Sequence, residues 1–261
     1  MSQIPMPPRS PARDILKGKT AVITAAAGAG IGFAAAQRFS EEGAELLISD
    51  IHERRLSEAA DKLAAETGRR PATLICDVTV EDQVQALRTE AHRVLGHVDV
   101  LVNNAGLGTS YAIVEMTDDQ WSRVLDVTLN SVFRMCRAFL PDMYARKSGV
   151  VVNNSSVLGW RAQPLQAHYA AAKAGVMAFT RAAAMESAEH GVRVNAVAPS
   201  IVMHEFLSRS ADAAFLTELT SREAFGRGAE PWEVANVMLF LASDLSSYMT
   251  GEVVSVSSQR A

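Results

Sequence analysis

Two side chains suited to acid–base chemistry stand four residues apart in Tyr169-Ala-Ala-Ala-Lys173, at the start of an Ala-rich stretch. On a helix this spacing places the phenol and the ammonium on one face, one turn apart. A nearby ammonium stabilises a phenolate and lowers a phenol pKa that is normally about 10. The pair therefore predicts a tyrosine that exchanges a proton near neutral pH.

Ser156 strengthens this interpretation, because the pair alone arises easily by chance in a chain with four tyrosines. The serine stands thirteen residues before Tyr169, just after the apolar run Val150–Asn153. Its hydroxyl could hold a substrate oxygen beside the tyrosine proton. A second apolar run ends in Asn103-Asn-Ala-Gly106, where amide side chains and a small glycine can support a cofactor cleft.

A glycine-rich turn, Thr24-Ala-Ala-Ala-Gly28-Ala-Gly30-Ile31-Gly32, separates the first expected strand from the first expected helix. Glycines let the backbone approach a pyrophosphate, and a helix N-terminus supplies free N–H groups with partial positive charge. Asp50 ends the next expected strand, 20 residues after Gly30. A carboxylate there can bind the ribose 2′-hydroxyl of NAD and repel the 2′-phosphate of NADP. The predicted cofactor is therefore NAD.

Two other interpretations of this region stay open. Asp50 could cap the helix that follows it. Arg54 or Arg55 could instead reach a 2′-phosphate, although arginines in the first turn of a helix are often simply solvated.

The rest of the chain supplies the elements that must position these groups. From Leu16 onward, short apolar runs alternate with longer Ala-rich helical stretches. This predicts an α/β fold: a single-domain, Rossmann-like, doubly wound sheet of seven mainly parallel strands with helices on both faces. The motifs then meet at the carboxyl edge of the sheet. The expected strands are Thr20–Thr24, Glu45–Asp50, Ala72–Cys76, Val98–Asn103, Val150–Asn153, Val194–Ala198 and Val253–Val256. The expected helices are Ile31–Glu42, Arg54–Glu66, Glu81–Leu95, Asp118–Arg146, Tyr169–His190 and Pro231–Ser243.

Composition excludes several classes of function. The chain has 261 residues, a net charge of −4 and 48% hydrophobic residues, enough for one substantial core. Because 25 Lys and Arg face 29 Asp and Glu without a long basic run, we expect no nucleic-acid partner. No apolar stretch reaches about 18 residues, and the start lacks a secretory signal, so we expect no membrane partner and a cytoplasmic location. Cys76 and Cys136 are too few and too far apart for a metal site.

Taken together, the motifs resemble those of the short-chain dehydrogenase/reductase family from about Leu16 to the C-terminus. The resemblance rests on the motifs above, together with Cys76-Asp77-Val78 and Arg193-Val-Asn-Ala-Val-Ala-Pro199. It implies that residues 1–15 are a flexible Pro-rich extension and that residues 16–261 form the NAD(P)-binding catalytic domain. The family's four catalytic positions fall at Tyr169 (general acid/base), Ser156 (orienting the reacting C–O group), Lys173 (binding the nicotinamide ribose and lowering the tyrosine pKa) and Thr128. The implied cofactor contacts are Thr24, Gly28, Gly30, Ile31, Gly32, Asp50, Asp77, Val78, Asn104, Ala105, Gly106, Tyr169, Lys173, Pro199 and Val202. Of these, Ile31 has a bulky apolar side chain that is expected to pack inside the protein rather than touch the ligand.

The sequence departs from the family pattern at two of these places. Ala25 stands where the family usually has glycine, and one extra residue precedes Gly30. Thr128 stands where the family has a catalytic asparagine whose main-chain carbonyl holds a water of a proton relay. A threonine can present the same carbonyl, so we expect the relay to survive. Asn130 is then an ordinary helix residue.

Residues Ile201–Phe225 are expected to cover the substrate, and they mix apolar residues with arginines. That mixture is typical of a site for a bulky hydrophobic substrate that carries phosphate, such as a coenzyme A thioester. A surface helix with solvated arginines explains it equally well. His204 replaces a threonine common in the family and could contact pyrophosphate or substrate. Trp160 and Gln163 are expected to border the pocket.

The strings Gly159–Gln163, Pro199-Ser-Ile201 and Ser246–Ser258 resemble reductases of bacterial steroid-ring degradation more narrowly. This implies NAD-dependent oxidation of a ring hydroxyl on a bicyclic hydroxyacyl-CoA. The alternatives are an NADPH-dependent 3-oxoacyl-thioester reductase and a non-catalytic nucleotide-binding sensor or scaffold. Family members pair through helices equivalent to Asp118–Arg146 and Tyr169–His190, which implies a homotetramer or a homodimer.

Overall fold

A computed structural model describes residues 6–203 and 213–258. In this part of the chain, seven strands form one sheet in the order β3-β2-β1-β4-β5-β6-β7, and every pairing is parallel. The strands are β1 (Thr20–Thr24), β2 (Glu45–Asp50), β3 (Ala72–Ile75), β4 (Val100–Asn103), β5 (Gly149–Asn154), β6 (Val192–Pro199) and β7 (Val253–Val256). The predicted single-domain, Rossmann-like α/β fold is therefore confirmed, and the strand order reverses between β1 and β4, where such sheets bind ligands.

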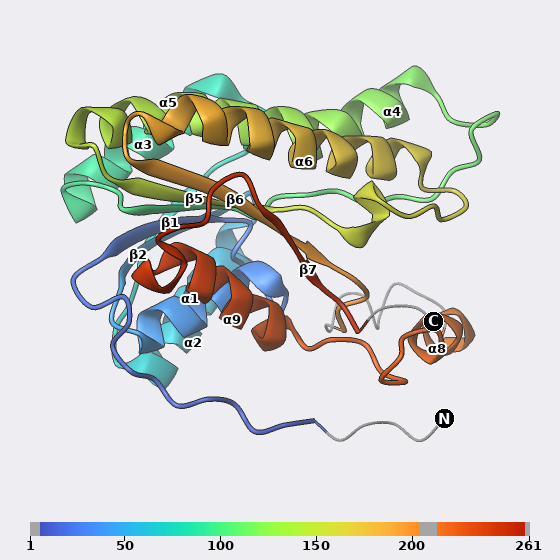
Figure 1. Cartoon of the computed structure of the whole chain (residues 1–261), viewed down its shortest axis with the longest axis horizontal. Helices are drawn as coiled ribbons and strands as arrows, with labels where there is room; N and C mark the ends of the chain where they lie inside the picture. Colours follow the sequence, from blue (N-terminus) through green and yellow to red (C-terminus); the bar gives the residue numbers. More distant parts are fainter. Residues whose placement is uncertain (1–5, 204–212, 259–261) are drawn as a thin grey trace.

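Helices cover both faces of the sheet (Figure 1). Those on one face are α1 (Ile31–Glu41), α2 (Glu53–Thr67) and α9 (Pro231–Ala242), and those on the other are α3 (Glu81–Leu95), α5 (Ser131–Arg146) and α6 (Ala167–Ala188). Each face encloses its own cluster of buried apolar side chains. Because β1 and β4 are buried along their whole length between these layers, their sequences read as unbroken apolar runs.

One expected helix is divided in the structure. The stretch predicted as a single helix over Asp118–Arg146 consists of α4 (Asp118–Leu125), a π-helical turn η1 (Asp126–Asn130) and α5. The wider turn coincides with two side chains that form local bonds. Thr128 Oγ1 accepts the Leu107 N–H at 3.0 Å, and Ser131 Oγ donates to Val127 O at 2.6 Å. Such hydroxyl bonds compete with regular helix geometry, and the apolar periodicity gives no sign of them.

The Pro-rich extension lies against α1. The Arg38 guanidinium donates to Ser10 O at 2.7 Å and forms an ion pair with the fully buried carboxylate of Glu42. That carboxylate also accepts the backbone N–H groups of Arg13 at 2.9 Å and Ile15 at 3.0 Å. The extension was expected to be flexible, but residues 10–15 are held to the domain by these contacts.

We predict that Glu42→Ala lowers the free energy of unfolding by about 3 kcal/mol, because the buried Arg38 guanidinium loses its ion-pair partner and two backbone N–H groups lose their acceptor. Glu41→Ala removes the pair with Arg9, whose side chain is 40% exposed, and a longer 3.5 Å pair with Arg38, and because the Glu42 carboxylate stays in place it is expected to cost less than about 1 kcal/mol. Denaturant unfolding of both variants measures the difference. Equal losses would contradict the anchoring role of Glu42.

Candidate active site

The three residues predicted to do acid–base chemistry lie together at the carboxyl edge of the sheet. Ser156 follows β5 by two residues and begins the short helix η2 (Val157–Gly159), accepting the Leu158 N–H at 3.2 Å. Tyr169 lies in the first turn of α6 and shares a hydrogen bond with the Ser156 hydroxyl. Lys173 Nζ lies 5.5 Å from the centre of the Tyr169 ring. The predicted spacing therefore produces the expected cluster.

Lys173 is almost completely enclosed, with 2% of its surface exposed. Its ammonium donates to Asn154 O at 2.6 Å, and its own carbonyl accepts from Ser155 Oγ at 2.9 Å. Burial lowers the pKa of Lys173 to about 7.

The tyrosine pKa differs from the sequence expectation, which was that Lys173 lowers it. Burial raises the pKa of Tyr169 to about 12, and the hydrogen bond from Ser156 opposes this shift only in part. The physical reason is that enclosing a phenolate is costly, while the neighbouring ammonium lies against the ring and is bound to Asn154 O. In the protein chain alone, desolvation therefore dominates.

Thr128 lies behind this cluster and is fully buried. A Cβ placed on Gly106 would be 3.4 Å from Lys173 Nζ and 4.0 Å from Thr128 Cγ2, so this glycine fits between the two side chains. The threonine hydroxyl holds the loop after β4, and a relay through its main-chain carbonyl stays a prediction. Asn130 is exposed and donates to Asp126 Oδ1 at 3.1 Å, as expected of a helix surface residue.

The glycine-rich turn is tied to the end of β4. Thr24 Oγ1 accepts the N–H groups of Asn104 at 3.0 Å and Ala105 at 3.3 Å. In return, the Asn104 amide donates to Thr24 O at 3.2 Å and Ala25 O at 3.0 Å. Ala25 has a φ of 51°, in the left-handed region that favours glycine. The family's usual glycine at this position is therefore explained by the positive φ, which glycine adopts without strain.

The start of α1 fits a dinucleotide pyrophosphate. Gly30 caps this helix without any side-chain bond to its first N–H groups, and a Cβ on Gly28 or Gly30 would meet no atom within 4 Å. The first turn therefore offers N–H donors beside open space. Ile31 instead packs against the apolar core, as expected of an apolar side chain. A Cβ on Gly32 would lie 2.3 Å from Ala25 O, which excludes larger residues there.

Asp50 lies where an adenosine ribose is expected. Its carboxylate accepts the N–H groups of Ala27 at 3.3 Å and His52 at 3.1 Å. Burial raises the pKa of Asp50, and the bond from the Ala27 N–H and the charge of Arg55 oppose this shift. The capping alternative is wrong, because α2 begins after His52 and Asp50 binds no N–H of that helix. Arg54 pairs with Glu58 at 3.2 Å.

Asp77 and Val78 follow β3 in the turn expected to receive the adenine. Asp77 Oδ1 accepts both the N–H of Thr79 at 2.9 Å and its hydroxyl at 2.7 Å. The Val78 side chain is buried in the core. The two residues therefore hold a fixed turn at the same sheet edge as Asp50.

Asn154 was missed by the sequence analysis. Its Nδ2 donates to Asn104 Oδ1 at 2.9 Å, and its carbonyl accepts the Lys173 ammonium. Because the Asn104 amide group already donates to the glycine-rich turn, its oxygen must accept, which orients the Asn154 amide. Asn154 therefore connects the glycine-rich turn to Lys173. The available signal was a polar residue at the end of an otherwise apolar strand.

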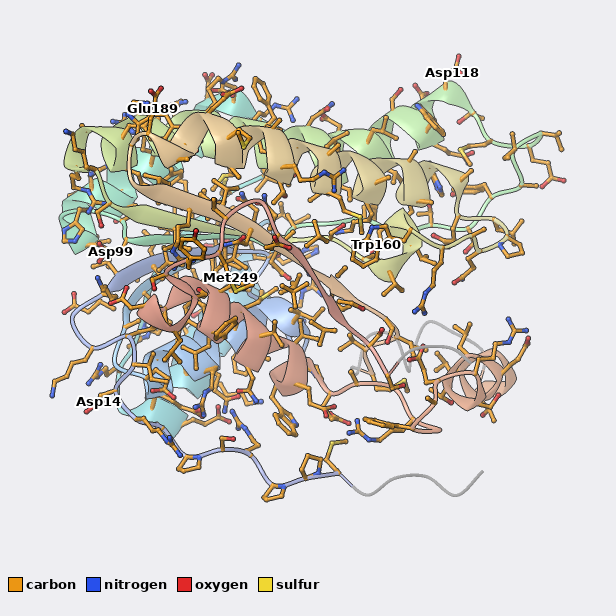
Figure 2. All side chains as sticks on the ribbon, viewed as in Figure 1. Asp14, Asp99, Asp118, Trp160, Glu189 and Met249 are labelled. Carbon is orange, nitrogen blue, oxygen red and sulfur yellow. The ribbon has the colours of Figure 1, made fainter. Side chains whose placement is uncertain are left out.

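The far side of the site is formed by the segment after β6. Pro199 ends β6, and Val202 forms a parallel bridge with Ala229. Trp160 is 53% exposed in the segment between β5 and α6, and Figure 2 shows it on the side of the molecule where α8 (Ala213–Ser221) lies, away from Asp99. Gln163 follows in the same segment, partly exposed. His204 lies outside the described residues.

Two further findings concern residues 6–203 and 213–258. None of their helices has both the length and the apolar character needed to cross a bilayer. They also contain no group of three or more His, Cys, Asp and Glu side chains placed to hold a metal ion.

Comparison with known proteins decides the family. A family model described as enoyl-(acyl carrier protein) reductase matches residues 25–258. The crystal structure of a short chain dehydrogenase from Mycobacterium smegmatis superposes with a TM-score of 0.87 at 54% identity, covering 98% of each chain. This chain belongs to the short-chain dehydrogenase/reductase family. It is therefore an oxidoreductase of secondary alcohols and ketones that uses a nicotinamide dinucleotide.

Two curated relatives of this short-chain dehydrogenase/reductase are informative. One, from Mycobacterium tuberculosis, is named (5R,7aS)-5-hydroxy-7a-methyl-1-oxo-2,3,5,6,7,7a-hexahydro-1H-indene-carboxyl-CoA reductase, and it is 58% identical over 248 residues, with 94% of each chain covered. The other, a 3-oxoacyl-(acyl-carrier-protein) reductase from Thermotoga maritima, is 39% identical over 244 residues, covering 92% of this chain and 97% of the relative.

The glycine-rich turn yields a paired prediction. Gly30→Ala is expected to leave the melting temperature within about 1 °C, since its new methyl group meets open space, but to weaken NADH binding at least about tenfold. Gly32→Ala is expected to lower the melting temperature by about 5 °C or more, because its methyl group would overlap Ala25 O. Thermal unfolding and NADH fluorescence titration measure both. Unchanged NADH affinity in Gly30→Ala would contradict the assignment of the pyrophosphate to this helix N-terminus.

Proposed function

We propose that this chain is an NAD-dependent dehydrogenase that interconverts a secondary alcohol and a ketone on a bicyclic hydroxyacyl-CoA, such as an intermediate of steroid-ring degradation. The observation that carries the chemistry is the hydrogen bond between Tyr169 and Ser156 beside the buried ammonium of Lys173. The substrate class is supported by the 58% identity to the Mycobacterium tuberculosis reductase, which is named for such a thioester.

The residues have distinct tasks in this reaction. The nicotinamide dinucleotide, when bound, accepts the hydride in oxidation and supplies it in reduction. In oxidation, the Tyr169 phenolate takes the hydroxyl proton of the substrate as the carbinol carbon loses a hydride, which leaves a ketone. In reduction, the Tyr169 phenol returns that proton to the ketone oxygen. Ser156 donates a hydrogen bond to the same oxygen, and Lys173 binds the nicotinamide ribose.

The rest of the cofactor site follows the glycine-rich turn and Asp50. The N–H groups at the start of α1 bind the pyrophosphate, and Asp77 and Val78 receive the adenine. The carboxylate of Asp50 binds the ribose 2′-hydroxyl and disfavours a 2′-phosphate, which supports NAD over NADP. Pro199 and Val202 would contact the nicotinamide.

Substrate contacts in this proposal come from the segment between β5 and α6 and from His204, which follows β6 in the sequence. Trp160, 53% exposed, and Leu165, 51% exposed, present apolar surface close in sequence to Ser156 and Tyr169. Partly exposed apolar side chains near a polar reaction centre suit a fused hydrocarbon ring that carries one reacting oxygen. Gln163 and His204 are the polar substrate contacts in this proposal.

A second candidate is an NADPH-dependent 3-oxoacyl-thioester reductase. The 39% identity to the Thermotoga maritima reductase favours it. The two candidates differ in the cofactor, because a 2′-phosphate would lie against the carboxylate of Asp50.

The protein is also proposed to be cytoplasmic and to assemble as a homotetramer or a homodimer. Phe133 on α5 is 46% exposed and Met185 on α6 is 79% exposed. Exposed apolar side chains on these helices are consistent with pairing through them, and light scattering measures the assembly state.

The cofactor choice gives a direct prediction. We expect kcat/KM to be at least about tenfold higher with NAD than with NADP, and Asp50→Ala to reduce this ratio by about tenfold, since a like-charge repulsion of about 1.4 kcal/mol is lost. Glu53→Ala, in the same surface hollow as Arg54 and Arg55, is the control and should leave the ratio within about twofold. A wild-type preference for NADP would overturn the NAD assignment and favour the 3-oxoacyl reductase.

The raised pKa of Tyr169 predicts how rate depends on pH. Below a folded-state pKa of about 12 the phenol is protonated, so oxidation, which needs the phenolate, should accelerate by up to about tenfold per pH unit between about pH 6 and 9. Reduction needs the phenol, which stays protonated over that range, so its rate should change only where Lys173 titrates, at a pKa of about 7. Initial rates in both directions measure the two slopes.

Tyr169→Phe should lower kcat by about a thousandfold or more, remove the rise with pH and leave NADH affinity within about twofold. Tyr111→Phe, at a nearby tyrosine, serves as the control and should keep the wild-type profile. Retained turnover in Tyr169→Phe would support the non-catalytic alternative or a different proton donor.

A further inference from the structure

Two loops that flank the catalytic tyrosine are joined to each other. One is Leu107–Tyr111, which follows β4, and the other is Leu165–His168, which runs into the first turn of α6. The bonds between them are Tyr111 N–H to Leu165 O at 3.0 Å, Gln166 Nε2 to Ser110 Oγ at 3.0 Å, and a 2.7 Å contact between Thr109 Oγ1 and His168 Nε2. Neither loop contains any cofactor contact implied by the family resemblance.

The contact at His168 differs from the Gln166–Ser110 bond because it is partly buried. The imidazole is fully buried, whereas the Gln166–Ser110 bond lies in solvent. Burial lowers the pKa of His168, so the ring is neutral at pH 7. Its Nδ1 has no hydrogen-bond partner among the described residues. Because an unpaired buried N–H is costlier than a bare ring nitrogen, the proton belongs on Nε2, which then donates to Thr109 Oγ1.

The segment before His168 is held in an unusual shape. Leu165 has a φ of 65°, in the left-handed region that a branched side chain rarely adopts, and its carbonyl accepts the Tyr111 N–H. The Tyr111 ring meets the His168 imidazole edge-on, with ring centres 6.1 Å apart. A strained residue persists only where surrounding contacts over-determine it, and here the loop after β4 supplies those contacts.

This loop also touches the catalytic residue. A Cβ on Gly108 would lie 3.7 Å from Cδ2 and 3.8 Å from Cε2 of the Tyr169 ring, so the loop backbone packs on the phenol ring. Thr109 directly follows Gly108 in the chain, and His168 directly precedes Tyr169. We propose that the partly buried Thr109–His168 hydrogen bond is a positioning contact that holds the loop after β4 against the Tyr169 ring and keeps the phenol within reach of Ser156 and the substrate oxygen.

This inference rests on the proposed role of Tyr169. A loop shifted by loss of the bond would misplace the proton donor while the glycine-rich turn and Asp50 stay in place. The proposal therefore predicts a loss in kcat without a loss of cofactor affinity, which general unfolding would not produce.

The test compares three single variants in the full-length enzyme. Thr109→Val removes the acceptor at equal volume and is expected to lower kcat about tenfold, with NADH affinity unchanged within about twofold. Thr109→Ser keeps the hydroxyl and should stay within about twofold of wild type in kcat. Ser110→Ala removes the exposed neighbouring bond and is the matched control, with kcat also within about twofold. Wild-type kcat in Thr109→Val, or an equal loss in Ser110→Ala, would overturn the proposal.

A readout that does not depend on turnover separates this inference from the proposed function. Hydrogen exchange of the peptide 105–117, followed by mass spectrometry, should be about tenfold faster in Thr109→Val and unchanged in Thr109→Ser. If the wild type fails to oxidise the bicyclic thioester but this pattern appears, the positioning role of the Thr109–His168 bond is supported and the substrate assignment fails. Equal protection of this peptide from exchange in all variants would overturn the positioning role of the Thr109–His168 bond even in an active enzyme.

Discussion

The site depends on one buried cation. The ammonium of Lys173 is enclosed by protein and donates to the carbonyl of Asn154, the last residue of β5. Burying a charged group is costly unless it is hydrogen-bonded, so this lysine requires β5 and α6 to keep a fixed separation. Ser155 contributes to that separation by bonding the lysine carbonyl, and Gly106 leaves room for the side chain. Tyr169, one turn earlier on α6, is then placed beside Ser156.

From this cation, a chain of hydrogen bonds runs across three strand ends. Asn154 donates to Asn104 at the end of β4, and Asn104 donates to the carbonyls of Thr24 and Ala25 after β1. Lys173 and the glycine-rich turn are therefore parts of one polar network at the point where the strand order reverses. Each member accepts and donates in a way that fixes its neighbour, so the cleft is preorganised for the dinucleotide.

Much of the fold could be predicted because burial on both sheet faces makes β1 and β4 unbroken apolar runs, and because Tyr169 and Lys173 lie one helical turn apart. The π-helical turn could not be predicted, since it follows tertiary bonds made by Thr128 and Ser131 that no apolar period reports. The raised pKa of Tyr169 depends on desolvation, which spacing alone does not reveal. Asn154 could not be predicted either, because its bonds to Asn104 and Lys173 form only when β4 and β5 pair and α6 packs beside them.

In the proposed reaction, the Tyr169 phenol transfers a proton at a carbon–oxygen bond while hydride passes between that carbon and a nicotinamide. Deuterium on the carbinol carbon of a bicyclic hydroxyacyl-CoA follows the hydride directly, and mass spectrometry of the reduced cofactor locates it. With the wild-type enzyme and NAD, we expect the label on the nicotinamide ring. Ketone formation with no label on the cofactor would contradict this mechanism.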